Sequence, residues 1–323
     1  MLEKNLYQKD KLEQVPTRNG FGEGLVELGK VNENIVVLGA DLTGSTRCDA
    51  FKKEFPDRFI QVGIAEQNLV GVAVGLALSG KIPFASTYSV FCPGRNWDQI
   101  RISAAYNQAN VKLTGAHAGV SVGPDGATHQ GMEDIAITRC LPNMTVLAPC
   151  DYIETKKATI AAGKMKGPVY LRFAREATPV FTTKETEFKI GKAQVFRQGN
   201  DVAIIACGPT VYEALLAANE LEKEKISVAV VNNPSVKPID EETICKIAKQ
   251  TGAVVTAEDH QVMGGMGSVV CEVLAKNVPV PVEMIGAQDR FGESGQQEEL
   301  MKLFKMDKES IKKAVKKVLK RKQ

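Results

Sequence analysis

Short apolar runs alternate with helical patterns along most of the chain, and this alternation constrains the fold more than any other feature. The runs typical of strands cover residues 34–41, 58–63, 83–88, 111–117, 145–150 and 167–173. Helical patterns lie between them, near residues 65–79, 95–107, 131–140 and 151–163. Because apolar strands that alternate with helices favour a parallel sheet covered on both faces, we expect an α/β fold with a doubly wound sheet.

A polar segment interrupts this alternation at residues 176–200, which contain Pro179 and a cluster of threonines. Strand-like runs then return at residues 201–207, 227–233, 253–259 and 280–286, again with helical patterns between them. We therefore predict two doubly wound domains: a larger, mostly parallel-sheet domain at 1–180 and a smaller α/β domain at 201–323, joined by a linker at 181–200. The length of 323 residues agrees, since one domain takes roughly 100–200 residues.

Charge and cysteine content narrow the function classes. Lys and Arg number 41 against 38 Asp and Glu, a net charge of +3, which argues against a large nucleic-acid footprint. Seven cysteines without a CxxC pair fit a reducing compartment, and no run is apolar enough for a signal core or a membrane span. We therefore expect a cytoplasmic protein without membrane or nucleic-acid partners. The basic segment 308–323 predicts an amphipathic helix with a solvated face, in preference to a membrane or RNA contact.

Polar side chains end or follow several predicted strands. These residues are Asp41, Tyr88, His117 and Arg175. Open α/β sheets bind ligands outside the carboxyl ends of their strands, so we expect the functional site at this edge.

Glu66 stands at the first turn of a predicted helix that carries no polar side chain from Leu69 to Leu78. The pattern predicts a helix buried all round. The carboxylate could simply complement the helix dipole. A desolvated carboxylate, however, can have a raised pKa and share a proton with a ligand nitrogen.

The segment GPDGATHQGMED, residues 123–134, holds one of only three histidines, His129, and a second, His117, lies just upstream. Together with Asp125 they flank a glycine-rich turn. They either cap neighbouring elements or serve proton transfer and hydroxyl recognition. Their spacing does not match a zinc site.

Aromatic and cationic residues suggest ligand contacts of two further kinds. Tyr88 and Phe91 stand three apart at a strand-to-loop transition, where they could stack on a flat heterocycle or pack into the core. Candidates for binding phosphate, each in a loop or at a strand end, are Arg18, Ser45 and Arg175. Surface ion pairs are the competing explanation for the two arginines.

The remaining motifs do not indicate a further ligand-binding or catalytic site. The chain has no GxxxxGK[ST] loop and no GxSxG elbow. The stretch MGGMGS at 263–268 predicts a tight turn into a helix rather than a dinucleotide site, and His260 is expected in a turn or an interface.

Taken in order, GADLTGST, GIAEQN, YSVF, GAHAGVSVGPDGATHQGMEDIA and LRFARE resemble the C-terminal half of transketolase, from about residue 15 to the end. The resemblance implies a pyrimidine-binding domain followed by a C-terminal domain, with thiamine diphosphate as cofactor. It also implies transfer of two-carbon ketol groups between sugar phosphates, an activity associated with the pentose phosphate pathway. The motifs fix neither the ketose donor nor the aldose acceptor.

The resemblance also assigns roles to single residues. Glu66 resembles the glutamate that bonds N1′ of the aminopyrimidine. Phe91 resembles the aromatic residue that stacks on that ring, and Tyr88 lies near it. Asp41 resembles the acid near the pyrimidine at the subunit interface. Contacts to sugar hydroxyls and the substrate phosphate would come from His117, Asp125 and His129. The phosphate-holding set would be Arg18, Ser45 and Arg175. Glu66, His117 and His129 are thereby the expected catalytic residues, and no metal ligand is expected in this chain.

Three departures from the family pattern matter. The GDG…N motif that holds Mg²⁺ and the diphosphate in full-length members does not occur here, and the chain is about half their length. We therefore expect a split transketolase, in which a separate N-terminal-half subunit binds Mg²⁺ and the diphosphate in an α2β2 assembly. The stretch Cys92-Pro93-Gly94 also differs from the larger residues of some relatives, which affects the shape of the pocket.

Three other interpretations stay open. A 1-deoxyxylulose-5-phosphate synthase shares the GIAEQ, YSxF and DGxTHQG patterns, but it normally keeps both halves in one chain. A 2-oxoacid dehydrogenase β subunit has a similar length but lacks the set formed by His117, Asp125, His129 and Arg175. A non-catalytic regulatory subunit would not need an intact Glu66 and Phe91.

Overall fold

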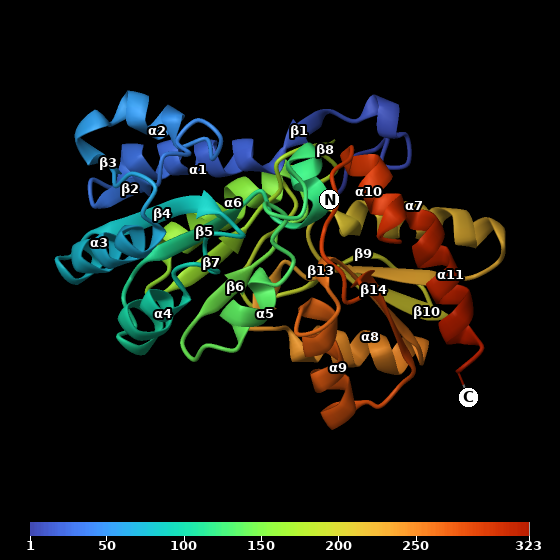
Figure 1. The fold of residues 1–323 in the computed structure, drawn as a ribbon. Helices are drawn as coiled ribbons and strands as arrows, with labels where there is room; N and C mark the ends of the chain where they lie inside the picture. Colours follow the sequence, from blue (N-terminus) through green and yellow to red (C-terminus); the bar gives the residue numbers. More distant parts are fainter. Residues whose placement is uncertain (323) are drawn as a thin grey trace.

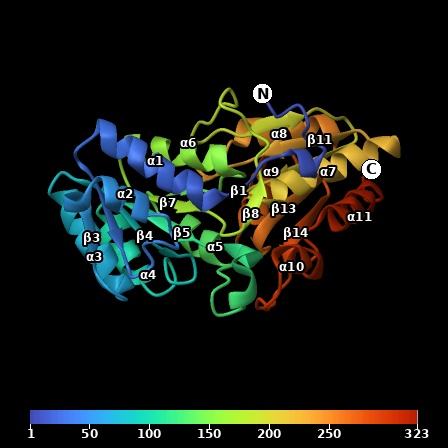
Figure 2. The ribbon, with the colours of Figure 1, turned by 90° about the horizontal axis from the view of Figure 1, so that it is seen from above.

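The larger part of the chain is built on a seven-stranded sheet. The computed structural model describes residues 1–322 and shows two α/β parts lying side by side (Figures 1 and 2). The sheet has the order β12-β6-β7-β5-β4-β2-β3. Its strands are β2 (Ile35–Gly39), β3 (Phe59–Gln61), β4 (Ile82–Tyr88), β5 (Lys112–Ala116), β6 (Thr145–Leu147), β7 (Val169–Arg172) and β12 (Ser235–Lys237). All neighbours pair in parallel except β12, so the predicted parallel sheet is confirmed.

Helices cover both faces of this sheet, as the alternation predicts. One face packs against α1 (Thr17–Val31), α2 (Asp49–Glu54) and α6 (Tyr152–Lys164). The other packs against α3 (Glu66–Leu78), α5 (Asp134–Arg139), and α4 (Trp97–Gln99) with the π-helix η3 (Ile100–Tyr106) that continues it. A 3-10 segment, η4 (Gly119–Asp125), follows β5 at the edge where the strands end.

Helix α1 is not among the helices expected from the sequence. Its four glycines lower helix propensity, but each lies where a neighbour packs too closely for a side chain: α6 at Gly20 and Gly24, Arg47 at Gly22, and α2 at Gly29. A methyl group on Gly20 would collide with the backbone oxygen of Tyr152, and one on Gly24 would lie 2.8 Å from Cβ of Thr159. Arg18, expected in a loop or at a strand end, lies in the first turn of this helix.

The smaller part contains a five-stranded sheet of order β14-β13-β10-β11-β9. Its strands are β9 (Gln194–Arg197), β10 (Val202–Ala206), β11 (Val228–Asn232), β13 (Val254–Gln261) and β14 (Val282–Ala287). One face packs against α7 (Thr210–Lys223) and α11 (Lys308–Leu319), and the other against α8 (Glu241–Thr251) and α9 (Met266–Asn277). Strand β9 pairs antiparallel with β11, so part of the segment expected as a linker belongs to this sheet.

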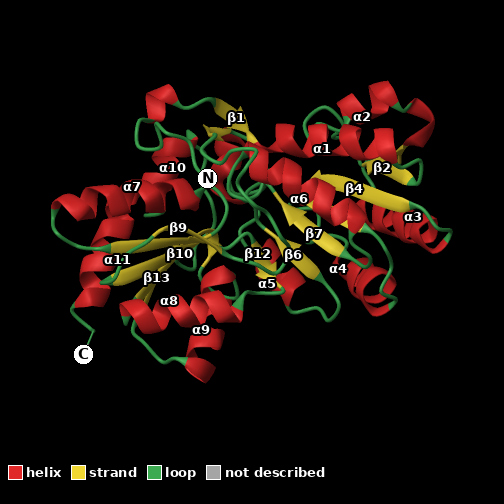
Figure 3. Ribbon diagram, turned by 180° about the vertical axis from the view of Figure 1, so that it is seen from behind, coloured by secondary structure: helices red, strands yellow, loops and turns green. Residues whose placement is uncertain are grey.

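The two parts share structure rather than merely touching. Strand β12 comes from the smaller part but extends the larger sheet by pairing with β6, as Figure 3 shows from behind. Near the junction, β1 (Gln14–Pro16) and β8 (Ala177–Pro179) form a small antiparallel ribbon. A short helix, α10 (Gln297–Leu303), lies beside η4. One hydrophobic cluster includes Leu113 of the larger sheet and Ile205 of the smaller one.

The C-terminal helix α11 is amphipathic, as the sequence predicts. Ile311, Val315 and Val318 are buried against the smaller sheet. On the basic side, the ammonium groups of Lys308 and Lys312 lie 2.5 and 2.6 Å from the Glu220 carboxylate, and their hydrogen bonds lower its pKa to about 2. Much of the expected solvated face thus pairs within the chain. Each helix described within residues 1–322 is too short or too polar to span a lipid bilayer.

Candidate active site

Three adjacent strands bring the predicted site residues to one edge of the larger sheet. Tyr88 is the last residue of β4, His117 follows β5, and Arg175 follows β7. Since β5 pairs with both β4 and β7 in parallel, these residues leave the sheet on the same side. The rings of Tyr88 and His117 stack with their centroids 3.9 Å apart. The sequence prediction that these side chains gather at the strand ends matches the geometry.

Phe91 and His129 complete an aromatic cluster with Tyr88 and His117. The Phe91 ring lies 5.9 Å from Tyr88, and the His129 ring lies 5.6 Å from Phe91 with an interplanar angle of 74°. Phe91 and His129 are half-buried, whereas Tyr88 is buried. Thr128 Oγ1 lies 2.9 Å from Nδ1 of His129 and fixes its ring. Four rings of this kind form a partly open wall on which a flat ligand can pack.

His117 is a buried neutral imidazole. Burial, with the neighbouring charges of Arg18 and Arg175, lowers its pKa to about 3, so it carries no charge at physiological pH. Nη1 of Arg18 lies 3.5 Å from its Nε2, and a guanidinium can only donate, so Nε2 accepts and the proton sits on Nδ1. Nδ1 is buried and finds no partner among residues 1–322. An unpaired buried donor costs about 1–3 kcal/mol, which favours an acceptor on a bound molecule.

Glu66 is the first residue of α3, and its side chain is 2% exposed. Its Oε2 accepts a 2.9 Å hydrogen bond from Nη1 of Arg95, and its backbone oxygen accepts one of 3.1 Å from Nδ2 of Asn96. The Arg95 guanidinium also lies over the ring of Phe91, 5.0 Å from its centroid. Arg95 therefore connects the carboxylate to the aromatic cluster.

The expectation that α3 is buried all round is wrong. Leu69, Val70 and Ala73 are buried, but Leu78 is 67% exposed, and a methyl group added to Gly75 would meet nothing within 4 Å. An apolar pattern predicts burial but cannot say whether the covering surface belongs to the same chain.

Arg18 lies within a group of cations. It donates to the backbone oxygen of Ser45 at 3.0 Å. Burial lowers its pKa, and the nearby charges of Arg47 and Arg175 lower it further. Arginines that repel one another in this way create a positive potential that attracts anions. Arg47 was not among the sequence candidates, although its position two residues after Ser45 was a usable signal.

Arg175 crosses the glycine-rich turn. Its Nη1 donates to the Val122 backbone oxygen at 2.6 Å and lies 3.4 Å from Oδ1 of Asp125. Asp125 is exposed, and such an exposed pair holds the arginine weakly. The turn itself depends on Gly119 and Gly123, whose φ angles are 68° and 71°.

Asp41 lies apart from these contacts. It is exposed after β2 with a φ angle of 61°, and its N–H donates to Oε1 of Gln61 at 2.8 Å. Its side chain forms no hydrogen bond or ion pair within residues 1–322. Its expected role near a subunit interface stays a prediction, as do the roles of the other site residues.

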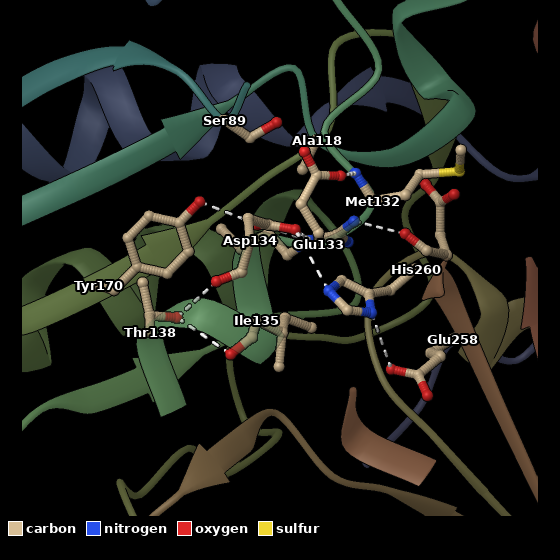
Figure 4. A network of polar contacts seen from close by, with 12 residues as sticks. Ser89, Ala118, Met132, Glu133, Asp134, Ile135, Thr138, Tyr170, Glu258 and His260 are labelled. Atoms are coloured by element: carbon tan, nitrogen blue, oxygen red, sulfur yellow. Dashed lines mark hydrogen bonds and ion pairs between the residues drawn. The ribbon is translucent and has the colours of Figure 1, made fainter. Parts of the chain in front are cut away.

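A buried polar network ties the site to the smaller part, and Figure 4 shows the portion of it around Asp134, Tyr170 and His260. Oδ2 of Asp134 accepts from the Tyr170 hydroxyl at 2.8 Å and from Nε of Arg172 at 3.0 Å. Arg172 also donates to the backbone oxygen of Asp259. In turn, Oδ1 of Asp259 accepts from the N–H of Val120, at 2.9 Å, in the turn after His117. This link between distant segments has no sequence signal.

His260 belongs to the same network. It is fully buried on β13 rather than in a turn, and its Nε2 lies 3.8 Å from Oδ1 of Asp134 in the larger part. Its Nδ1 lies 2.7 Å from the Gln261 backbone oxygen, and burial lowers its pKa to about 4. The expected turn position is wrong, and the structure shows a contact between the two parts. No cluster of three or more metal-ligating side chains occurs in residues 1–322.

Comparisons with known proteins agree with this architecture. The family model for the transketolase pyrimidine-binding domain matches residues 13–180, and that for the transketolase C-terminal domain matches residues 191–311. A putative transketolase C-terminal section of Methanocaldococcus jannaschii is 49% identical over 301 residues, 92% of this chain and 94% of that protein. A 6-deoxy-6-sulfo-D-fructose transketolase subunit of Clostridium sp. is 41% identical, over 97% of each chain.

A full-length relative and a solved structure are also similar to this chain. Human transketolase is 38% identical over 94% of this chain, which spans 49% of the human protein. A solved split-gene transketolase, named as an inactive β4 tetramer, is 45% identical with a TM-score of 0.90, over 96% of this chain and 100% of that one. The two matched domains and these identities show that the chain belongs to the transketolase family.

Proposed function

We propose that the chain is one subunit of a thiamine-diphosphate-dependent transketolase that transfers a two-carbon ketol unit from a ketose phosphate to an aldose phosphate. The observation that carries the proposal is the buried carboxylate of Glu66 beside a cluster of aromatic rings and histidines. An aminopyrimidine ring can be bound by a carboxylate that bonds its ring nitrogen and by an aromatic face on which it stacks.

The residues fit this cofactor. Glu66 would bond the pyrimidine nitrogen, and Phe91, with Tyr88 behind it, would support the ring. When bound, the cofactor supplies the electron sink for cleavage of the carbon–carbon bond, and the protein supplies orientation and electrostatics. Asp41, exposed after β2, would lie at the border with a partner chain.

The substrate side of the site has proton donors and a cationic end. The N–H at Nδ1 of His117 would donate to a ketose oxygen, and His129 would hold or move a proton at a second oxygen. Arg18 and Arg175, with Ser45, would bind the terminal anion of the sugar, while Asp125 would accept from a hydroxyl group. The names of two relatives, a sulfofructose transketolase and an apulose-4-phosphate transketolase, support a ketose with a terminal anion.

A second chain would supply the remaining half of the active site. This chain spans 94% and 97% of the two relatives named as a C-terminal section and a subunit, but about half of human transketolase. The partner would bind Mg²⁺ and the diphosphate, in an α2β2 assembly. Seven cysteines without a disulfide in the described chain support a cytoplasmic location.

A two-carbon transfer assay tests the proposal. The chain is purified with its co-purifying partner and given Mg²⁺, thiamine diphosphate, xylulose 5-phosphate and ribose 5-phosphate. We expect sedoheptulose 7-phosphate from the pair and none from either chain alone. Transfer by this chain alone would contradict the two-subunit proposal. If the pair binds cofactor but uses pyruvate and not a ketose phosphate, the synthase-like or dehydrogenase-like alternative replaces it.

A further inference from the structure

Arg95 holds both of the groups that the proposed function assigns to the aminopyrimidine ring. Its Nη1 donates to Oε2 of Glu66 at 2.9 Å, and its guanidinium lies 5.0 Å from the centroid of Phe91. A guanidinium is flat, it presents N–H donors along its edge, and it packs on aromatic faces. An aminopyrimidine that bonds a carboxylate and stacks on a phenyl ring has the same properties.

The two partners of this ion pair differ in freedom to move. The Glu66 side chain is 2% exposed, and the Asn96 side chain holds its backbone at the start of α3. The Arg95 side chain is 52% exposed and comes from the loop between β4 and α4. Arg95 can therefore swing into solvent on its long side chain while the carboxylate stays in place.

Arg95 and the pyrimidine ring would contact the same two groups. Nη1 of Arg95 bonds the Glu66 carboxylate that the proposed function gives to the ring nitrogen, and its guanidinium covers the Phe91 face on which the ring would stack. Arg95 and a bound pyrimidine therefore compete for the Glu66 carboxylate and for the space over Phe91.

We propose that Arg95 is a built-in competitor for the pyrimidine site. Its side chain covers Glu66 and Phe91 in the cofactor-free subunit, and the pyrimidine ring displaces it on binding. This inference rests on the proposed function. A site that is open for only part of the time shows an apparent affinity reduced by that fraction. The same contact protects a buried carboxylate from being left without a partner before the cofactor arrives.

If the cofactor displaces Arg95, removal of its side chain should strengthen cofactor binding but destabilise the cofactor-free chain. A purely structural role for Arg95 predicts no gain in cofactor binding. In Arg95→Ala, the dissociation constant for thiamine diphosphate should fall about tenfold, since a partly exposed ion pair and a cation–π contact together correspond to roughly one order of magnitude in an equilibrium constant. The cofactor-free chain should instead melt at a lower temperature than wild type. Arg95→Lys keeps the charge but loses the flat stacking group, so its affinity should lie between the two.

The measurement uses the complex of this chain with its partner. Thiamine diphosphate is titrated with Mg²⁺ by calorimetry into complexes that carry wild type, Arg95→Ala, Arg95→Lys or the control Arg101→Ala. Arg101 is exposed on η3 and forms no ion pair in the described chain. Fluorescence of Trp97, the only tryptophan of this subunit and two residues from Arg95, reports whether the loop changes on binding.

The outcomes separate the two proposals. Tighter binding by Arg95→Ala, with the control unchanged, supports the competitor. Equal or weaker binding by Arg95→Ala, when wild type binds normally, overturns the competitor and leaves the proposed function intact. If neither wild type nor Arg95→Ala binds thiamine diphosphate although both assemble with the partner, the proposed function fails, and this inference fails with it.

Discussion

The ring of His117 stacks on the ring of Tyr88 at 3.9 Å, while its Nε2 faces Nη1 of Arg18 at 3.5 Å. One nitrogen is thereby committed to the protein, and the buried Nδ1 has no partner in residues 1–322. We expect His117→Ala to lower kcat/KM by roughly 10²–10⁴-fold, the usual contribution of a positioned proton donor. Steady-state kinetics of the two-subunit complex check this. The affinity for thiamine diphosphate should be unchanged, and a large loss of it would assign the ring to the cofactor instead.

The lowered pKa of His117 predicts a pH dependence of folding. Its pKa falls from an ordinary 6.5 to about 3 because of burial and nearby arginines. Between these values the unfolded chain binds a proton that the folded chain does not, so the contribution of His117 to stability is present above 6.5 and is lost as the pH falls towards 3.

In His117→Gln, the unfolding free energy should therefore fall less steeply with acidification, by up to about 1.4 kcal/mol per pH unit below 6.5. Denaturant titrations of this chain at several pH values measure the difference from wild type. The half-buried His129 offers a matched control as His129→Gln. Parallel curves for wild type and His117→Gln would show that the imidazole titrates normally.

Glu66 should be essential for turnover but not for folding. Glu66→Ala and Glu66→Gln remove the proton-sharing carboxylate, and we expect two-carbon transfer to fall at least about 10²-fold. Circular dichroism and assembly with the partner should remain as in wild type, because the backbone of Glu66 stays tied to Asn96. Transfer near the wild-type rate in either variant would refute the proposed role.

His129 is expected to act on the substrate rather than on the cofactor. Its ring meets Phe91 edge-on and is half-buried, so it borders the open side of the cluster. His129→Ala should raise KM for the ketose or lower kcat, while calorimetry shows cofactor affinity within about twofold of wild type. The reverse pattern, weak cofactor binding with an unchanged KM, would count against this role.

Gly119 should tolerate no side chain. Its φ angle is 68°, and a methyl group there would collide with the carboxylate of Asp259. Gly119→Ala should destabilise the chain by about 1–3 kcal/mol and reduce activity, because it separates the turn from its anchor. Thermal melts measure this, with Gly71→Ala as control, since a methyl group on Gly71 meets nothing within 4 Å. Equal melting temperatures for the two variants would show that the turn relaxes without cost.

Much of the fold follows from local patterns, because buried parallel strands must be apolar and β-branched wherever they occur. The features that the sequence did not reveal depend on contacts between distant segments. Four glycines make α1 hard to predict, because they are required by the close approach of α6, α2 and Arg47, which are distant in the sequence. The contact of Asp259 with the turn after His117 joins residues 139 positions apart. Arg95 stands four residues after Phe91, yet only the structure shows that it also reaches Glu66.

Strand β12 has a consequence for how the chain can be divided. It leaves the smaller part to become the outer strand of the larger sheet, next to β6. A fragment cut after residue 180 would leave β6 as a bare edge, with unpaired backbone groups open to pairing with another molecule. The two domains are therefore not interchangeable modules. Swapping the C-terminal domain for that of a relative would also replace the seventh strand of the sheet that carries the proposed site.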